Sequence, residues 1–178
     1  MMPKKYEQIV FRKPTPMDGA DMYQLVKESG VLDTNSEYCY LMLCKYFSDT
    51  CVIAESNGQM VGFVSAFQPP AEKDCMFIWQ IAVSTKYQGS GIGTYLIQAA
   101  LSQQDMGVRY IEATISLGNA ASIALFDKIA KQLGSICTVS SGFESHHFSD
   151  KLHEAEWLHR IGPFSLEPSN HQLGEFIQ

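Results

Sequence analysis

Positive charge is scarce in this 178-residue sequence, where 13 Lys and Arg stand against 19 Asp and Glu and give a net charge of −6. Nucleic acid is bound mainly through positive charge, so it is a poor candidate for the main partner. Long apolar runs are also missing, because none approaches the roughly 18 residues of a membrane span. The opening stretch, MMPKKYEQIVF, lacks the apolar core of a secretory signal. We therefore expect a cytoplasmic protein that binds neither nucleic acid nor membrane.

Patterns typical of metal sites and disulfide frameworks are absent as well. The five cysteines are odd in number, and no two of them have C-x-x-C spacing. Most lie in apolar runs, as small core residues do. The five histidines also lack metal-ligand pairing. We expect free thiols in a reducing compartment and no metal.

The composition that remains is that of a globular protein, with 46% hydrophobic and 18% charged residues. There is no internal repeat, low-complexity tract or linker, so we expect a single domain over residues 9–165, with tails at 1–8 and 166–178. The predicted element order is β-α-α-β-β-β-α-β-α-β-β. An antiparallel meander that feeds one β-α-β crossover predicts a mixed, mostly antiparallel sheet of the α+β class. The predicted strands are 8–13, 51–55, 59–67, 75–83, 109–116, 135–140 and 152–161, and the predicted helices are 15–28, one from 35 or 36, 91–104 and 119–133.

One stretch, YQGSGIGTYL, has glycine at three alternate positions between a predicted strand and a predicted helix: Gly89, Gly91 and Gly93. Bare backbone N–H groups at a helix start bind phosphate, although such glycines can also form a plain tight turn. A mononucleotide P-loop is excluded, because no lysine follows Gly93. A dinucleotide site is disfavoured, since G-x-G-x-G after a meander is not G-x-G-x-x-G after the first strand.

The same stretch resembles the Q/R-x-x-G-x-G/A signature of the GNAT superfamily of N-acetyltransferases. Ile81-Ala82-Val83 precede it as in that family, and Asn119-Ala120-Ala121-Ser122 resembles the family's second motif, one strand later. The resemblance implies a GNAT-like fold with a splay between strands 75–83 and 109–116, and acetyl-CoA as co-substrate. It implies that the pantetheine arm pairs with Ile81, Ala82 and Val83 and contacts Asn119 and Ser122, and that Phe126 lines the thiol end. The residues implied to hold the diphosphate are Gln88, Gly89, Ser90, Gly91, Ile92, Gly93 and Thr94. Lys86 or Lys128 could meet the 3′-phosphate.

Acetyl transfer to an amine needs a neutral nucleophile, so the site must take up a proton. It must also stabilise the oxyanion, which backbone N–H groups near residues 81–83 could do. Family members often have a tyrosine seven positions after the motif asparagine, acting as the acid on the departing thiolate. Here that position is Phe126, so the acid is either lacking or supplied from elsewhere.

Four further stretches resemble the branch of the superfamily that acetylates the γ-amino group of L-2,4-diaminobutyrate on the route to the compatible solute ectoine. They are LDTNSEYCYLMLCKYFSDTCVIAE (32–55), FIWQIAV (77–83), RYIEATISLGNAAS (109–122) and HEAEWLHRIGP (153–163). This resemblance also implies a homodimer. Another small amine, a polyamine, a protein N-terminus, acyl-CoA binding without turnover and nicotinamide binding remain alternatives.

A substrate with two amines and one carboxylate needs polar contacts that distinguish its two ends. Asp33 is a candidate partner for an ammonium group, or else a helix cap, and Asn35 and Tyr38 can supply polar groups from the same turn. Trp79 lies two residues before Ile81 on the same strand face, where it could wall the substrate or fill the core.

The last predicted strand is unusually polar, because LHEAEWLH contains His153, Glu154 and Glu156. On a strand, Glu154 and Glu156 share one face and His153 takes the other. They can belong to an exposed edge, or provide a carboxylate for the substrate ammonium and a base for proton uptake. We favour Glu154 over Glu156 as the base. Trp79 and Glu154 are thus our catalytic candidates, while Asp33, Asn35, Tyr38, Trp79, His153, Glu154 and Glu156 are our substrate-binding candidates.

Overall fold

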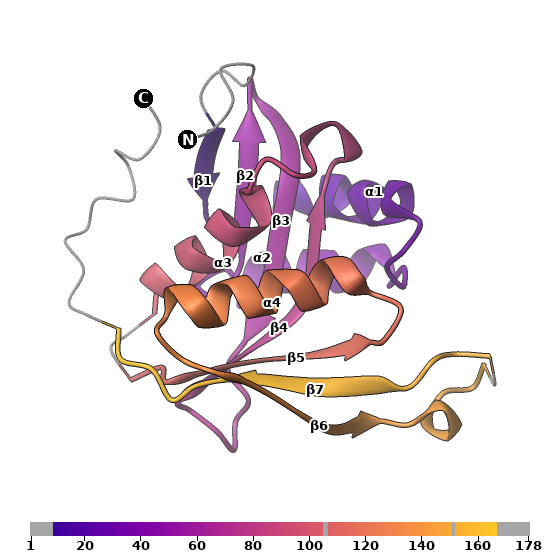
Figure 1. The fold of residues 1–178 in the computed structure, drawn as a ribbon. Coiled ribbons are helices and arrows are strands. Elements are labelled where there is room, and N and C mark those ends of the chain that lie inside the picture. Colours follow the sequence, from indigo (N-terminus) through magenta and orange to yellow (C-terminus); the bar gives the residue numbers. More distant parts are fainter. Residues whose placement is uncertain (1–8, 105–106, 151, 167–178) are drawn as a thin grey trace. The chain divides into compact units, whose positions relative to one another are not determined.

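The computed structural model describes residues 9–104, 107–150 and 152–166 (Figure 1). These residues fall into two compact units: unit 1 holds residues 9–67 and 80–104, and unit 2 holds the others. The described strands are β1 (Ile9–Arg12), β2 (Val52–Ser56), β3 (Gln59–Phe67), β4 (Cys75–Val83), β5 (Tyr110–Ser116), β6 (Cys137–Phe143) and β7 (Glu156–Ile161), and the described α-helices are α1 (Gly19–Ser29), α2 (Glu37–Tyr46), α3 (Ile92–Ser102) and α4 (Ala120–Gln132).

Unit 1 contains an antiparallel meander with helices on both faces. β1 pairs with β2 and β2 with β3, both antiparallel. The β2–β3 turn has positive φ at Asn57 (51°) and Gly58 (74°), which is the turn geometry that suits the twist of a hairpin. On β3, Phe63 packs on Tyr40 of α2, while a Cβ at the neighbouring Gly62 would lie 3.4 Å from side chains of α3. The same Cβ would lie only 3.0 Å from the backbone carbonyl of Ala82 on β4, so glycine at that position leaves room for this carbonyl.

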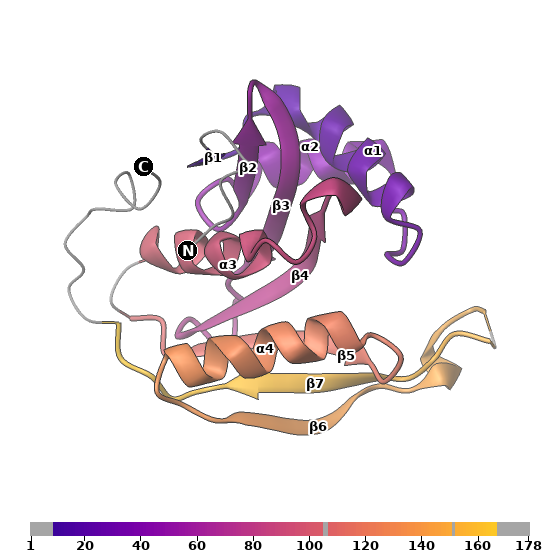
Figure 2. The same cartoon turned by 45° about the horizontal axis from the view of Figure 1, so that its top comes forward.

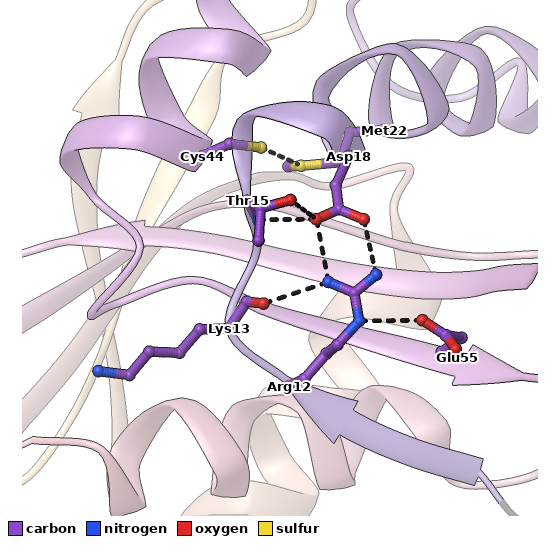
Figure 3. Close-up of polar contacts among 7 residues, drawn as sticks. All are labelled: Arg12, Lys13, Thr15, Asp18, Met22, Cys44 and Glu55. Atoms are coloured by element: carbon purple, nitrogen blue, oxygen red, sulfur yellow. Dashed lines mark hydrogen bonds and ion pairs between the residues drawn. The ribbon is translucent and has the colours of Figure 1, made fainter. Parts of the chain in front are cut away.

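An ion-pair network joins β1 to β2 and to the 3-10 turn Pro16–Asp18 (Figure 3). Arg12 on β1 donates two hydrogen bonds to the carboxylate of Asp18, at 2.9 and 2.7 Å, and a third to Glu55 on β2 at 2.9 Å. Asp18 also accepts from the backbone amide of Thr15 at 2.7 Å. These hydrogen bonds, those from Arg12 above all, hold the pKa of the buried Asp18 carboxyl below its usual range.

Unit 2 is built on strands β5, β7 and β6, in that spatial order, with α4 lying along them (Figures 1 and 2). β7 pairs antiparallel with both of its neighbours. β5 pairs in parallel with the first residues of β4, from Cys75↔Tyr110 to Phe77↔Glu112. Residues 78–83 of β4 lie beyond this ladder.

Arg160 on β7 connects three segments of unit 2. Its guanidinium lies 4.1 Å from the centre of the Tyr110 ring and donates to Glu72 at 2.9 Å and Glu112 at 2.5 Å. Glu72 lies in the β3–β4 loop, and Tyr110 and Glu112 lie on β5. Because Glu112 is buried, this pairing satisfies a carboxylate that would otherwise be costly to bury.

The predicted element order and the mixed, mostly antiparallel sheet are confirmed. The prediction for the last strand was wrong at its start: β7 begins at Glu156, and His153 and Glu154 precede it. The other terminal strand, β6, runs over Cys137–Phe143 instead of 135–140. The expected tails lie almost wholly outside the described residues, and the single-domain expectation stays a prediction. None of the helices that the structure describes combines the length and the apolar character of a membrane span.

Candidate active site

The glycine-rich loop of unit 1 connects β4 to α3. After a short 3-10 turn, Thr85–Tyr87, both Gly89 and Gly91 adopt the left-handed conformation, with φ of 76° and 88°. Gly91 is the N-cap of α3, and its carbonyl accepts from the amides of Thr94 and Tyr95, at 3.0 and 3.2 Å. Two left-handed residues separated by one other require glycine on steric grounds, which explains part of the repeat.

This loop presents several backbone amides without an internal partner. Within the described part of the chain, no hydrogen-bond acceptor pairs with the N–H groups of Gly89, Gly91, Ile92 or Gly93. The side chains of Ile92 and Thr94 are buried, so the first turn of α3 is anchored. Free amides on an anchored helix start, together with the partial positive charge of the helix dipole, make a site suited to a phosphate group.

Two polar side chains of the loop serve its own shape. Gln88 donates its amide to the carbonyl of Val83 at 3.3 Å, and Ser90 donates its hydroxyl to the carbonyl of Tyr87 at 2.5 Å. These bonds close the loop on itself, and that role does not exclude binding of a phosphate by the neighbouring amides. Diphosphate binding by residues 88–94 stays a prediction.

Strand β4 alternates between a buried and a more exposed face. Gln80 and Ala82 are buried, whereas Trp79, Ile81 and Val83 are not. Trp79 is 42% exposed, which disfavours the alternative that it is a core residue. Ile81 and Val83 share its face, as the spacing predicted. Their roles toward pantetheine and substrate stay predictions.

The loop between α1 and α2, together with the first turn of α2, carries three of the substrate candidates. Ser36 caps α2 by accepting from the amide of Cys39 at 3.3 Å, so Asp33 is not the cap of this helix. Asp33 is exposed and Asn35 half-buried. Tyr38, in the first turn of α2, is 69% exposed and therefore not a core residue. All three side chains are thus accessible on unit 1, as a role in binding requires.

In unit 2, the second family motif forms the start of α4. The side chain of Asn119 accepts from the amide of Ser122 at 3.1 Å, which is the predicted cap. Phe126 is only 2% exposed and packs edge-on against His159 of β7, with ring centroids 6.3 Å apart. Burial lowers the pKa of His159, so this imidazole is held in the neutral form. The pantetheine contacts implied for Asn119, Ser122 and Phe126 stay predictions.

The expected shared face of Glu154 and Glu156 is wrong, because only Glu156 belongs to the strand. Glu154 is exposed and accepts from the amide of Gly118 at 3.4 Å, just before the α4 cap. Glu156 is half-buried and accepts from the hydroxyl of Thr114 at 2.5 Å. His153 stacks on Phe148, with ring centroids 3.7 Å apart. The two carboxylates therefore have separate partners and different surroundings.

Glu156 also borders a groove of about 530 Å³ at the end of β6 and β7. Its walls include the rings of Phe143 and Trp157 and the side chains of Glu144 and His146. His146 is a surface residue, and its Nδ1 lies 3.2 Å from the carboxylate of Glu144. Acidic and aromatic walls suit an amine better than an anion.

The cysteines do not provide a nucleophile. All five are free, and Cys44, Cys51 and Cys75 are buried. Burial raises the pKa of Cys51 to about 11 and those of Cys44 and Cys75 to about 12. Their thiols stay protonated near neutral pH, so they act as the small core residues that the sequence suggested.

Sequence reasoning missed four residues around these candidates: Tyr40, Gln80, Thr114 and His159. A signal for Gln80 existed, because it interrupts the otherwise apolar stretch CMFIWQIAV. Nothing in the local sequence marks Thr114 or Tyr40, since each acquires its partner only through the fold.

The strand order, the glycine-rich entry to α3 and the capped entry to α4 define an acetyltransferase architecture. Residues 19–130 match the acetyltransferase (GNAT) family, and the chain belongs to that family.

Within it, the chain is 48% identical over 160 residues to the L-2,4-diaminobutyric acid acetyltransferase of Marinococcus halophilus, an alignment that covers 89% of this chain and 92% of the relative. The enzyme of the same name from Halalkalibacterium halodurans is 46% identical over 156 residues, covering 87% of this chain and 82% of the relative. A solved structure of the diaminobutyrate acetyltransferase EctA from Paenibacillus lautus, in complex with L-2,4-diaminobutyric acid and coenzyme A, matches with a TM-score of 0.86 and 40% identity over 91% of this chain and 99% of that one.

Proposed function

We propose that this protein transfers the acetyl group of acetyl-CoA to the γ-amino group of L-2,4-diaminobutyrate. The product is N4-acetyl-diaminobutyrate, the precursor from which ectoine is formed by cyclisation. The observation that carries the proposal is the match over 91% of the chain to an enzyme solved with this substrate and coenzyme A. Relatives at 46–48% identity that have the same name support it.

The glycine-rich loop fits the diphosphate of coenzyme A. The amides of Gly89, Gly91, Ile92 and Gly93, which have no acceptor among the residues that the structure describes, offer donors, and the absence of side chains on the three glycines allows close approach. No lysine is needed where backbone donors and a helix dipole act together. Acetyl-CoA supplies an activated thioester, so the protein has only to bind it, orient it and deliver a neutral amine.

Neutralising the amine is the main demand on the protein's own residues. A primary amine with a pKa of about 10.4 is protonated at pH 7, and its deprotonation costs about 4.6 kcal/mol. We assign proton uptake to a carboxylate, directly or through water. Glu156 is the better placed of the two candidates, because it is half-buried and oriented by Thr114. Glu154 remains the alternative.

The selectivity for one nitrogen requires that the α-carbon end of the substrate be held. Asp33 carries a carboxylate that can pair with the α-ammonium group, and Asn35 can donate to the substrate carboxylate through its side-chain amide. An α-amine held as an ammonium ion cannot act as a nucleophile, so this pairing leaves the γ-nitrogen to react.

The departing thiolate needs no acid from position 126. Phe126 is buried against His159 and has no ionisable group. A coenzyme A thiolate is a tolerable leaving group by itself, since thiols have pKa values near 8.5. No covalent enzyme intermediate is required, which accords with the buried, protonated cysteines.

We further propose a homodimer that works in the cytoplasm and serves the response to osmotic stress. The resemblance to ectoine-pathway enzymes supports the dimer and the stress role, and five free thiols accord with a reducing compartment. Light scattering of the purified chain tests the dimer, which would have twice the 19.9 kDa chain mass.

The activity test mixes purified protein, acetyl-CoA and L-2,4-diaminobutyrate and follows free coenzyme A thiol, with NMR to locate the acetyl group. We expect thiol release that depends on diaminobutyrate and acetylation at the γ-nitrogen. A polyamine and an N-terminal peptide serve as competitor substrates. Preference for either would assign another amine, and tight acetyl-CoA binding without thiol release would indicate a binding domain.

A further inference from the structure

Two polar side chains lie inside the core of unit 1 without a part in the chemistry described above. Tyr40 of α2 is fully buried, and Gln80 of β4 is 7% exposed. The hydroxyl of Tyr40 donates to the side-chain oxygen of Gln80 at 3.1 Å. A buried polar pair of this kind is costly unless its remaining donors and acceptors are satisfied.

Both remaining groups are satisfied by the α1–α2 loop. The side-chain amide of Gln80 donates to the backbone carbonyl of Asp33 at 2.8 Å, and the backbone amide of Asn35 donates to the Tyr40 hydroxyl at 3.4 Å. The two loop contacts flank Thr34. Gln80, Tyr40, Asp33 and Asn35 thus form a closed set of three hydrogen bonds, which we name the Gln80–Tyr40 clasp.

The clasp rests on a rigid base. The Tyr40 ring packs edge-on against Tyr23 and Phe63, with centroid separations of 6.1 and 6.4 Å. The backbone amide of Gln80 donates to the hydroxyl of Ser65 at 3.2 Å, and this hydroxyl donates to the Gln80 carbonyl at 3.3 Å. Core packing therefore holds the Tyr40 ring, and the Ser65 hydroxyl holds the backbone of Gln80, while the loop that the two residues contact is otherwise at the surface.

We propose that Gln80 and Tyr40 are positioning residues that hold the α1–α2 loop in the conformation in which Asp33 and Asn35 bind the amine substrate. This inference rests on the proposed function for its link to substrate affinity. Neither residue contacts the substrate. Each acts through the backbone of the loop, so its loss affects binding of the amine and leaves binding of acetyl-CoA to the glycine-rich loop unchanged.

The test compares Tyr40→Phe and Gln80→Leu with the control Thr50→Val. Tyr40→Phe keeps the ring and its packing and removes only the hydroxyl. Thr50 is a matched control in unit 1: it is 9% exposed, and its hydroxyl lies within hydrogen-bond distance of the carbonyls of Ala66 and Phe47, at 2.5 and 3.0 Å, outside the α1–α2 loop. Thr50→Val thus removes a buried hydroxyl whose loss should cost a similar amount of stability, and it tests whether a general loss of stability explains the kinetic effects.

Two readouts are needed, of which one does not depend on turnover. The first is the pair of KM values for L-2,4-diaminobutyrate and acetyl-CoA. The second is amide hydrogen exchange by NMR at Asn35, with Ser84, whose amide donates to the carbonyl of Val61 at 2.8 Å, as an internal reference. We expect both clasp variants to raise the KM of the amine about five- to tenfold, as the loss of one buried hydrogen bond implies. The KM of acetyl-CoA should stay within about twofold, and exchange at Asn35 should accelerate only in the clasp variants.

An unchanged KM for the amine in both clasp variants, beside an active wild type, would overturn the inference. So would an equal rise of both KM values in the clasp variants and in Thr50→Val. Should the wild type not turn over diaminobutyrate, the proposed function fails on its own. The exchange measurement then decides alone, and unaltered exchange at Asn35 in Tyr40→Phe would show that the clasp does not hold the loop.

Discussion

The hydroxyl of Thr114 on β5 donates a hydrogen bond of 2.5 Å to the carboxylate of Glu156, the first residue of β7. Residue 156 pairs with Ser116 in the β5–β7 ladder, so Thr114 reaches it diagonally on the same face of the sheet. The bond fixes one carboxylate oxygen and thereby the direction of the whole group.

That relationship predicts which carboxylate matters most for the reaction. We expect Glu156→Gln to lower kcat/KM for diaminobutyrate about 100-fold, because a neutral amide can neither accept the proton nor pair with an ammonium group. Thr114→Val should cost about tenfold through lost orientation. Steady-state kinetics with both substrates checks this. Glu154→Gln is the matched comparison, and a larger loss in that variant would assign the role to Glu154.

Gly91→Ala should weaken acetyl-CoA binding. At a φ of 88° an alanine costs about 1 kcal/mol, and relief of that strain would turn the loop amides away from the diphosphate. We expect the KM of acetyl-CoA to rise about tenfold. Gly30→Ala, also at a left-handed position (φ 64°) but at the end of α1, should cost similar stability and leave that KM unchanged. Equal KM effects would remove the support for this phosphate site.

Asp33→Ala should raise the KM of diaminobutyrate and leave that of acetyl-CoA unchanged. The reason is that this variant removes a carboxylate from an exposed loop without disturbing the backbone carbonyl that Gln80 holds. An increase of about tenfold in the KM of the amine is expected for a lost charged hydrogen bond at an accessible site. A parallel rise in both KM values would point to a folding defect.

The Arg12–Asp18 pair should make stability depend on acid pH. The pKa of Asp18 is depressed in the folded state, so its stabilisation is complete above the unfolded value of about 3.9 and is lost as pH falls through the folded value. Asp18→Asn should lower the free energy of unfolding at pH 7 by about 2 kcal/mol. Urea denaturation at pH 7 and pH 3 measures both effects. The difference between variant and wild type should shrink at the lower pH, and a constant difference would contradict the assignment.

His159 should add a second pH dependence at a higher range. Burial lowers its folded pKa below the unfolded value of about 6.5, so the unfolded chain takes up a proton first. Stability is therefore highest above pH 6.5 and falls as the pH drops from there toward the folded pKa. Thermal unfolding at pH 7.5 and 5.5 should show a smaller shift of Tm in His159→Phe than in the wild type. Identical shifts would locate the titration at another histidine.

Local features of the sequence predicted much of the fold. The Asn57-Gly58 turn, the glycines before α3 and the Asn119 cap each depend on the conformation of a few adjacent residues, which the residue types themselves dictate. The polar stretch LHEAEWLH gave a wrong first residue for β7, because alternation of polar and apolar residues cannot locate the start of a strand when both of its faces are polar. Among the described residues of this stretch, ladder pairing with β5 and β6 begins at Glu156.

The sequence by itself determined the order of the elements and the position of the glycine-rich loop, because hydrophobic periodicity and the backbone freedom of glycine depend on residues that are close together in the chain. The tertiary structure alone decided that Gln80 holds a carbonyl 47 residues earlier in the chain and that Thr114 orients a carboxylate 42 residues later. Hydrogen bonds between distant residues depend on strand register and helix packing, and neither is encoded at the positions of the partners.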